Sequence, residues 1–192
     1  MGSEEIVLLN AAGEAIGTAP KASSHHRDTP YHLAFSCYVT DDAGRVLITR
    51  RALDKATFPG VWTNTCCGHP APGEGLRAAV TRRLETELGL TVDGLTLVLP
   101  EFDYRAVASD GVVEYERCPV VRAHWRGGRS PEPNPVEVAD AVWRSWEECL
   151  ELTRHPDASP WYRLQMAELA PLGPPAAWPA ADPSRLPPAL TW

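Results

Sequence analysis

The residues with the greatest chemical potential in this chain lie between positions 61 and 90. A thiol and an imidazole stand two positions apart at Cys67 and His69, a Gly/Pro-rich turn follows, and a helical pattern then carries Glu87. Thiols, imidazoles and carboxylates can ligate a metal ion or transfer a proton. The window therefore indicates a metal site or an acid–base site, although Cys67 and His69 alone could equally be half of a structural zinc site.

The spacing in this window resembles the Nudix box, G-x5-E-x7-R-E-U-x-E-E-x-G-U, where U is aliphatic. The matching residues are Gly68, Glu74, Arg82, Glu87, Gly89 and Leu90. Arg83 replaces the first paired glutamate of the box, and Thr86 replaces the first glutamate of its E-E pair. Nudix hydrolases use that carboxylate cluster to bind metals and activate water. The resemblance therefore implies that this chain retains diphosphate binding but not water attack.

Hydrophobic periodicity predicts the elements that position these groups. Strands are expected over residues 6–10, 31–40, 45–51, 61–65, 95–105, 112–125 and 138–146. Helices are expected over residues 74–88, 147–152 and 159–170, and the first of these, called the box helix below, ends at Gly89. Residues 19–31 read as a loop. Hairpins flanked by helices predict an α/β (α+β) mixed-sheet sandwich, as the Nudix resemblance also implies.

Length and composition predict one domain over residues 1–170, followed by a Pro/Ala-rich tail over residues 171–192 that we expect to be poorly ordered. The sequence has no apolar run of about 18 residues and no basic region before its first apolar run, so neither a membrane span nor a secretory signal is expected. Five cysteines without an export signal favour reduced thiols and a cytoplasmic location.

The net charge of −7 disfavours nucleic acid as a partner, because phosphate backbones are bound by basic surfaces. An anionic small molecule is still compatible with this charge if the basic residues are concentrated locally. The first half of the chain offers such a set, namely Lys21, Arg50, Arg51, Lys55, Arg82 and Arg83.

Three imidazoles and two carboxylates could complete a metal site. His25 and His32 flank the end of the predicted loop, and Glu114 and Glu116 leave one face of a predicted strand. Together with His69 they would make an octahedral-type site suited to zinc, manganese or magnesium. Taken singly, a strand histidine can be structural, and alternating glutamates can simply face solvent.

Short sequence motifs along the chain resemble those of one family, the type 1 isopentenyl-diphosphate Δ-isomerases, which have the Nudix fold. These motifs are HLAFS (32–36), LITRRAL (47–53), PGVWTNTCCGHP (59–70), ELG (87–89), FDYRA (102–106), VEYERCPV (113–120) and SPW (159–161). The likeness runs from about residue 4 to about residue 167 with similar spacing. The resemblance implies interconversion of isopentenyl and dimethylallyl diphosphate by protonation and deprotonation through a carbocation-like state.

By matching position, the resemblance makes Cys67 the acid/base thiol and Glu116 its counterpart on the other face of the substrate. A cysteine with an ordinary pKa near ~8.5 stays mostly protonated at neutral pH, as a proton donor must. Trp161 would stabilise the cation through its π face, and Tyr104 would hydrogen-bond near Glu116. Trp62 and Trp161 are candidates to line a closed, apolar pocket.

The resemblance also implies the ligands of two metals and a diphosphate. One cage for manganese, magnesium or zinc would consist of His25, His32, His69, Glu114 and Glu116. Glu87 would bind a magnesium ion that arrives with the diphosphate, helped by the backbone carbonyl of Cys67. The diphosphate itself would be bound by Lys21, Arg51 and Lys55, with Arg83 adding to them.

Two neighbouring pairs leave a choice open. An alternating strand end would point Cys66 and Cys67 in opposite directions, and the spacing to His69 favours Cys67 as the functional thiol. His25 and His26 lie in a loop, where alternation does not indicate which side chain faces the site. His25 is therefore chosen only because its position matches that of the family's metal ligand.

Two other classes of protein compete with the isomerase. A Nudix-type diphosphate hydrolase would need the carboxylate cluster that Arg83 and Thr86 interrupt. A non-catalytic module that uses the His/Cys/Glu set for folding would not need the cationic residues or Glu87. We therefore expect an isomerase acting on a small isoprenoid diphosphate, without nucleic-acid or membrane partners, as a monomer or weak dimer.

Overall fold

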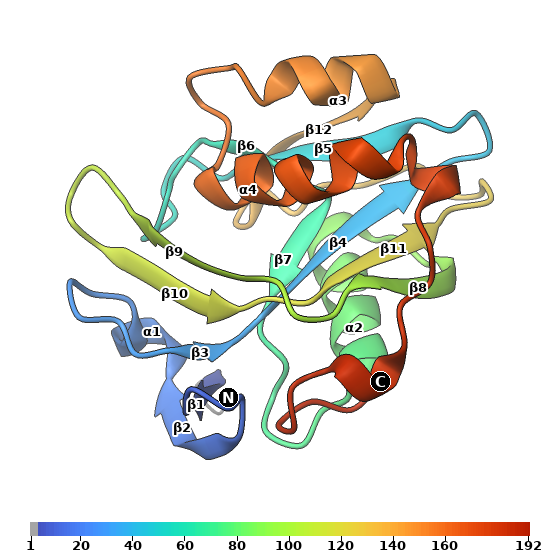
Figure 1. The fold of residues 1–192 in the computed structure, drawn as a ribbon. Coiled ribbons are helices and arrows are strands. Elements are labelled where there is room, and N and C mark those ends of the chain that lie inside the picture. The colour runs from blue at the N-terminus through green and yellow to red at the C-terminus, as the bar shows by residue number, and fades with distance from the viewer. Residues whose placement is uncertain (1–3) are drawn as a thin grey trace.

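Two β-sheets surrounded by helices make up residues 4–192, the part of the chain that the computed structural model describes (Figure 1). The first sheet runs in the order β2 (Ala15–Pro20), β1 (Glu5–Leu9), β3 (His32–Leu33), β10 (Val113–Arg117), β9 (Asp103–Val107). The second runs in the order β12 (Val138–Arg144), β5 (Val46–Arg51), β4 (Phe35–Thr40), β11 (Val120–His124), β8 (Asp93–Leu99). Two short strands extend it, β6 (Trp62–Thr63) beside β5 and β7 (Cys66–Gly68) beside β4. The predicted α/β (α+β) sandwich is confirmed.

Helices cover both faces of the second sheet (Figure 1). They are α2 (Leu76–Leu88) on one face and α3 (Trp146–Leu152) and α4 (Pro160–Leu169) on the other. The short helix α1 (Lys21–Ser24) instead contacts β1 and β2 of the first sheet. Alternation along β4 explains the two cores: Phe35 and Cys37 pack in one apolar cluster with α2, whereas Ala34 and Tyr38 pack in another with α4. The box helix is α2, and it ends where Gly89 adopts a φ of 62°, in the left-handed region that favours glycine.

Three segments predicted as single strands each divide between the sheets. Residues 95–105 lie in β8 of the second sheet and in β9 of the first. Residues 31–40 form β3 in the first sheet and β4 in the second, and residues 112–125 form β10 and β11 in the same way. These last two segments run parallel through the crossing, where Ala34 N donates to Arg117 O at 2.8 Å and Ser36 N to Pro119 O at 3.0 Å. Pro119 has no N–H to give to a ladder, and the strand assignment is interrupted there. The parallel register sets Glu116 opposite His32.

The N-terminal region holds more regular structure than its sequence suggests. Residues 15–20 form β2, an exposed edge strand paired with β1, and the predicted loop over residues 19–31 contains the single helical turn α1. Within residues 4–192, none of the helices has both the length and the apolar character needed to cross a membrane.

The structure differs from the expectation of a poorly ordered tail over residues 171–192. Trp178 packs in the cluster with α4, and Leu186 and Leu190 pack in the cluster with α2. Backbone hydrogen bonds reinforce this packing, since Thr191 O accepts from Leu76 N at 2.8 Å, at the start of α2. The Pro/Ala-rich composition suggested too little apolar surface to order the segment, but a few large side chains at wide spacing supply it.

Replacing Leu190 with alanine should lower the free energy of unfolding by about 2–3 kcal/mol, because its side chain is only 5% exposed and its loss leaves a cavity. Urea denaturation followed by circular dichroism measures this. Leu164→Ala is the matched control, since Leu164 is 46% exposed and its loss should cost under about 0.5 kcal/mol. Equal effects of the two substitutions would mean that residues 171–192 do not support the core.

Candidate active site

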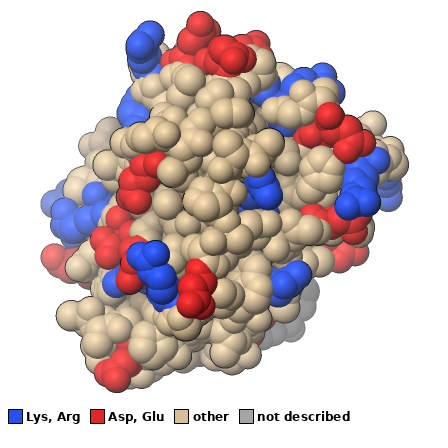
Figure 2. All heavy atoms as spheres, turned by 45° about the vertical axis from the view of Figure 1, so that its right-hand side comes forward, with Lys and Arg blue, Asp and Glu red and all other residues tan. Residues whose placement is uncertain are grey.

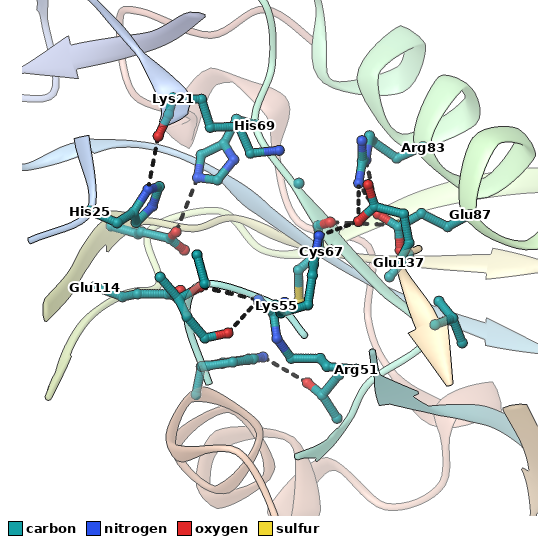
Figure 3. A pocket seen from close by; sticks show the side chains of 18 of the residues that line it. Lys21, His25, Arg51, Lys55, Cys67, His69, Arg83, Glu87, Glu114 and Glu137 are labelled. Atoms are coloured by element: carbon teal, nitrogen blue, oxygen red, sulfur yellow. Dashed lines mark hydrogen bonds and ion pairs between the residues drawn. The ribbon is translucent and has the colours of Figure 1, made fainter. Parts of the chain in front are cut away.

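A cavity of about 450 Å³ collects residues from both sheets, from α2 and from α4. Most of the side chains singled out in the sequence line it, as Figure 3 shows for the labelled residues, and the lining includes Lys21, His25, Arg51, Lys55, Cys67, His69, Arg83, Glu87, Tyr104, Glu114, Glu116 and Trp161. His32 lies directly behind this wall in the cluster described next. Segments far apart in the sequence therefore meet at one site.

Three imidazoles and one carboxylate form a compact cluster on one side of the cavity. One donor atom from each of His25, His32, His69 and Glu116 lies within 4.8 Å of all the others. The Nε2 atoms of His32 and His69 are 3.2 Å apart, and His69 Nε2 lies 3.2 Å from Glu116 Oε1. Glu114 lines the same cavity outside this four-residue cluster, and its carboxylate accepts a hydrogen bond from Tyr104 instead.

The cluster suits a divalent metal ion. His32 Nδ1 is 2.8 Å from Pro30 O and His25 Nδ1 is 3.3 Å from Lys21 O, so Nδ1–H is engaged and the Nε2 lone pairs are left for a ligand. Burial lowers the pKa of His69 to about 3, which keeps this imidazole neutral, and its Nδ1 is buried without a hydrogen-bond partner. Burial opposes ionisation of Glu116, but the neighbouring imidazoles of His32 and His69 hold its pKa well below the usual value.

Cys66 and Cys67 both line the cavity, but their thiols lie on opposite faces of β7. Alternation along β7 sends Cys66 into the apolar cluster beneath α2 and leaves Cys67 against the cluster on the other face. Cys67 Sγ donates to Asn64 Oδ1 at 3.2 Å and lies 3.4 Å from Ser36 Oγ. Burial raises the pKa of Cys67 to about 12, so the thiol is protonated at neutral pH.

Tyr104 and Trp161 close the apolar side of the cavity. The Tyr104 hydroxyl has one proton and lies 2.8 Å from Glu114 Oε2 and 2.9 Å from Glu116 Oε2, so it binds between the two carboxylates. Trp161 is 2% exposed, and its ring centroid is 5.9 Å from that of Tyr104. The Arg51 guanidinium lies 5.6 Å from the Trp161 ring centroid, so this indole already faces a cation.

Cationic side chains on the opposite wall are each held by the protein itself (Figure 3). Arg83 Nε donates to Glu87 Oε1 at 2.9 Å, and Arg83 also pairs with Glu137 at 3.3 Å, which in turn binds Lys55. Burial disfavours the charged form of Arg83, but the neighbouring Glu87 carboxylate raises the pKa of this guanidinium. Arg83 therefore keeps its charge.

Two further basic residues, Lys21 and Arg51, line other parts of the cavity. Lys21 pairs with Glu4 at 2.7 Å, and Arg51 donates to the backbone oxygens of Thr57 and Phe58 at 2.9 and 3.2 Å. Sequence reasoning missed the carboxylates of Glu4 and Glu137. Neither belongs to a periodic segment or a sequence motif, so no sequence signal pointed to them.

Arg82 does not line the cavity, and its side chain stabilises the structure around the site instead. Its guanidinium binds Glu74 through contacts of 2.8 and 2.7 Å, and Glu74 also accepts from Ala71 N at 2.8 Å. These bonds tie the turn after His69 to the box helix. Arg50 also points elsewhere, because it donates to Gly60 O at 2.9 Å. Two of the six candidate cations are therefore structural.

The face drawn in Figure 2 carries basic and acidic side chains in small, separate groups. Among the described residues visible there, positive charge forms no continuous surface of the kind that nucleic acid requires.

Comparison with known proteins gives consistent similarities. The NUDIX domain family matches residues 30–165. An isopentenyl-diphosphate Delta-isomerase from Saccharopolyspora erythraea is 57% identical over 187 residues, covering 96% of this chain and 95% of that protein. One from Mycolicibacterium vanbaalenii is 61% identical over 145 residues, covering 76% of this chain and 79% of that protein. The solved structure of DR0079 from Deinococcus radiodurans aligns with a TM-score of 0.62 at 18% identity, covering 84% of this chain and 96% of that one, and so shares the fold.

Replacing Glu74 with glutamine should lower the free energy of unfolding at pH 7 by about 1 kcal/mol, because the ion pair with Arg82 is lost. The Arg82 hydrogen bond lowers the pKa of Glu74, so its stabilisation is present above the ordinary carboxyl pKa and is lost as pH falls through the folded-state value. The gap between wild type and variant in urea denaturation should therefore close below about pH 4. Glu85→Gln, on the exposed face of the same helix, is the control and should show no gap. A gap independent of pH would contradict the role of the charge.

Proposed function

The chain belongs to the isopentenyl-diphosphate Delta-isomerase family of Nudix-fold proteins, and from this premise we propose that it interconverts isopentenyl and dimethylallyl diphosphate. It is an isomerase that moves a carbon–carbon double bond through a protonation and a deprotonation. One observation carries the site assignment: a protonated thiol, Cys67, and an ionised carboxylate, Glu116, line the same cavity.

The chemistry requires an acid and a base around a poorly basic alkene. In the direction of dimethylallyl diphosphate, the Cys67 thiol gives its proton to the terminal CH2 carbon, which becomes a methyl group. The positive charge develops on the tertiary carbon. Glu116 then accepts a proton from the neighbouring CH2, whose C–H electrons form the new double bond. The reverse reaction exchanges these roles, and no external oxidant or reductant is involved.

Aromatic groups protect and stabilise the charged state. The π face of Trp161 offers a cation the electrostatic attraction it already offers Arg51, and the apolar setting keeps water from capturing the carbocation. Tyr104 holds Glu116 through its hydroxyl and so fixes the carboxylate beside the reacting carbon.

The Nudix fold and the histidine cluster support a divalent metal in the site. We assign its ligands to His25, His32, His69 and Glu116, with Glu114 adjacent, and the ion to manganese, magnesium or zinc. When bound, this metal would supply positive charge that lowers the pKa of Glu116 and holds its carboxylate in place. Glu87 and the Cys67 carbonyl are assigned to magnesium that arrives with the diphosphate.

Lys21, Arg51, Lys55 and Arg83 are assigned to the diphosphate. Three of them are paired with the carboxylates of Glu4, Glu87 and Glu137 in the free protein. A diphosphate would take over these charge-assisted hydrogen bonds, and magnesium would take over Glu87. The hydrolase alternative is weaker, because Arg83 occupies the position of a glutamate of the box and pairs with Glu87, the one carboxylate left of the helical metal-binding cluster.

The reaction itself is tested by incubating the protein with isopentenyl diphosphate and magnesium in D2O and following proton NMR. Deuterium that enters a methyl group as dimethylallyl diphosphate appears is the expected result. Release of monophosphate or inorganic phosphate would instead show a hydrolase. No change with metal bound would leave a binding module.

Cys67→Ala and Glu116→Gln should each reduce kcat at least ~100-fold while the protein stays folded, because each removes one of the two proton-transfer groups. Cys66→Ala is the matched control and should keep nearly full activity, because that thiol packs beneath α2. A loss in Cys66→Ala comparable to that in Cys67→Ala would overturn the choice of thiol.

Addition of Mn²⁺, Zn²⁺ or Mg²⁺ to metal-stripped protein should raise its stability, by about 2.7 kcal/mol at a free metal concentration of 100 times Kd. Thermal unfolding at increasing metal concentration measures this effect. His25→Ala should weaken the response, whereas His26→Ala should preserve it, because only His25 belongs to the four-residue cluster. The same loss in both variants would mean that the choice of His25 over His26 as the metal ligand is wrong.

A further inference from the structure

A chain of buried hydrogen bonds joins the thiol of Cys67 to the indole of Trp161. Cys67 Sγ donates to Asn64 Oδ1 at 3.2 Å, and Thr63 Oγ1 donates to the same Asn64 oxygen at 2.8 Å. Trp161 Nε1 donates to Thr63 Oγ1 at 2.7 Å. The proton donor of the proposed reaction and the aromatic ring that meets the cation are thus separated by only two side chains.

The orientation of the Asn64 amide is fixed by its surroundings. Its nitrogen has two N–H groups, and they donate to the backbone oxygens of Cys37 at 3.0 Å and Cys66 at 2.9 Å. Both donors are therefore used, and the amide oxygen has to face Thr63 and Cys67. Asn64 offers the thiol one acceptor in one fixed position.

The Thr63 hydroxyl is equally constrained. It has a single proton, and that proton goes to the Asn64 amide oxygen, which has no hydrogen to give. Its oxygen then accepts from the Trp161 indole N–H at 2.7 Å and from the Ser159 hydroxyl at 3.1 Å. Every bond in the chain has one possible direction, so thiol and indole cannot shift independently.

These contacts are almost fully shielded from bulk solvent, although Thr63, Cys67 and Trp161 also line the cavity. Asn64 is 0% exposed, Trp161 2% and Thr63 4%. Loss of one hydroxyl from such a chain leaves a buried donor or acceptor without a partner, which is costlier than the loss of a solvent-exposed hydrogen bond.

We propose that Thr63 and Asn64 are positioning residues that keep the Cys67 thiol and the Trp161 ring aligned for proton delivery and for the cation that follows. This inference rests on the isomerase function proposed above. It predicts an effect mainly on turnover, because three of the four residues assigned to the diphosphate, Lys21, Lys55 and Arg83, are held by ion pairs outside this chain of bonds.

Thr63→Val tests the proposal, since valine keeps the shape of threonine and removes the hydroxyl. We expect kcat for isopentenyl diphosphate to fall about tenfold, because the loss of one hydrogen bond that aligns the thiol and the indole should raise the activation free energy by about the value of that bond. KM should stay within twofold of the wild-type value. Thr63→Ser keeps the hydroxyl and should restore most of the activity. Thr63→Ala removes the same hydroxyl with less bulk, and it replaces the valine variant if that variant does not fold.

Thr65→Val is the matched control. Thr65 is 0% exposed, and its hydroxyl bonds only to backbone groups, accepting from Val39 N at 2.8 Å and donating to Leu47 O. The substitution should lower the melting temperature without changing kcat per folded molecule.

Three results would overturn the positioning role: a Thr63→Val kcat within twofold of wild type, equal impairment of Thr63→Ser and Thr63→Val, or an equal loss of kcat in Thr65→Val. Each result is compared with the turnover of the wild-type protein. If the wild-type protein is active, such a result would overturn the positioning role and leave the isomerase function in place. A wild-type protein without turnover would overturn the proposed function, and the positioning role with it.

Discussion

The parallel pairing of two chain segments is the constraint on which the rest of the site depends. One segment carries β3 and β4, the other β10 and β11, and each pair of strands crosses from the first sheet to the second at the same level. This ladder places His32 opposite Glu116 and brings Ser36, beside the Cys67 thiol, to the same level as Val120. A shift of register by one residue would turn Glu116 away from the cavity, because side chains alternate between faces.

Charge in the cavity is balanced internally. Removing ionised groups from water is expensive unless they are paired, and Arg83, the most buried cation of the site, is paired with the carboxylates of Glu4, Glu87 and Glu137. The histidine cluster is not held by ion pairs of this kind. Burial keeps His69 neutral, and the neighbouring imidazoles stabilise the negative charge of Glu116. The free protein thus presents a cavity whose cations are already oriented, and an anionic ligand exchanges one set of partners for another.

Much of this arrangement could be predicted from the sequence. Alternation separated Cys66 from Cys67 correctly, and the predicted strands placed Glu114 and Glu116 on one face. The division of residues 31–40 between two sheets could not be predicted, because this segment alternates without a break. Residues 95–105 and 112–125 also divide, and each contains a proline, Pro100 or Pro119, that argues against one continuous strand. Glu4 and Glu137 lie outside any pattern, and the roles of Thr63 and Asn64 depend on hydrogen-bond directions that only coordinates reveal. Residues 171–192 show that composition alone underestimates what three well-spaced apolar side chains can anchor.

The crossing of the two segments also has a consequence for how the protein folds. Its partners, such as His32 and Glu116, lie far apart in the sequence, and parallel strands cannot form from a local hairpin. Contacts of this kind require the closure of long loops before they become favourable, so they form slowly compared with the helices. The cluster of His25, His32, His69 and Glu116 is therefore expected to assemble late in folding, because a partly folded chain has its histidines but not their geometry.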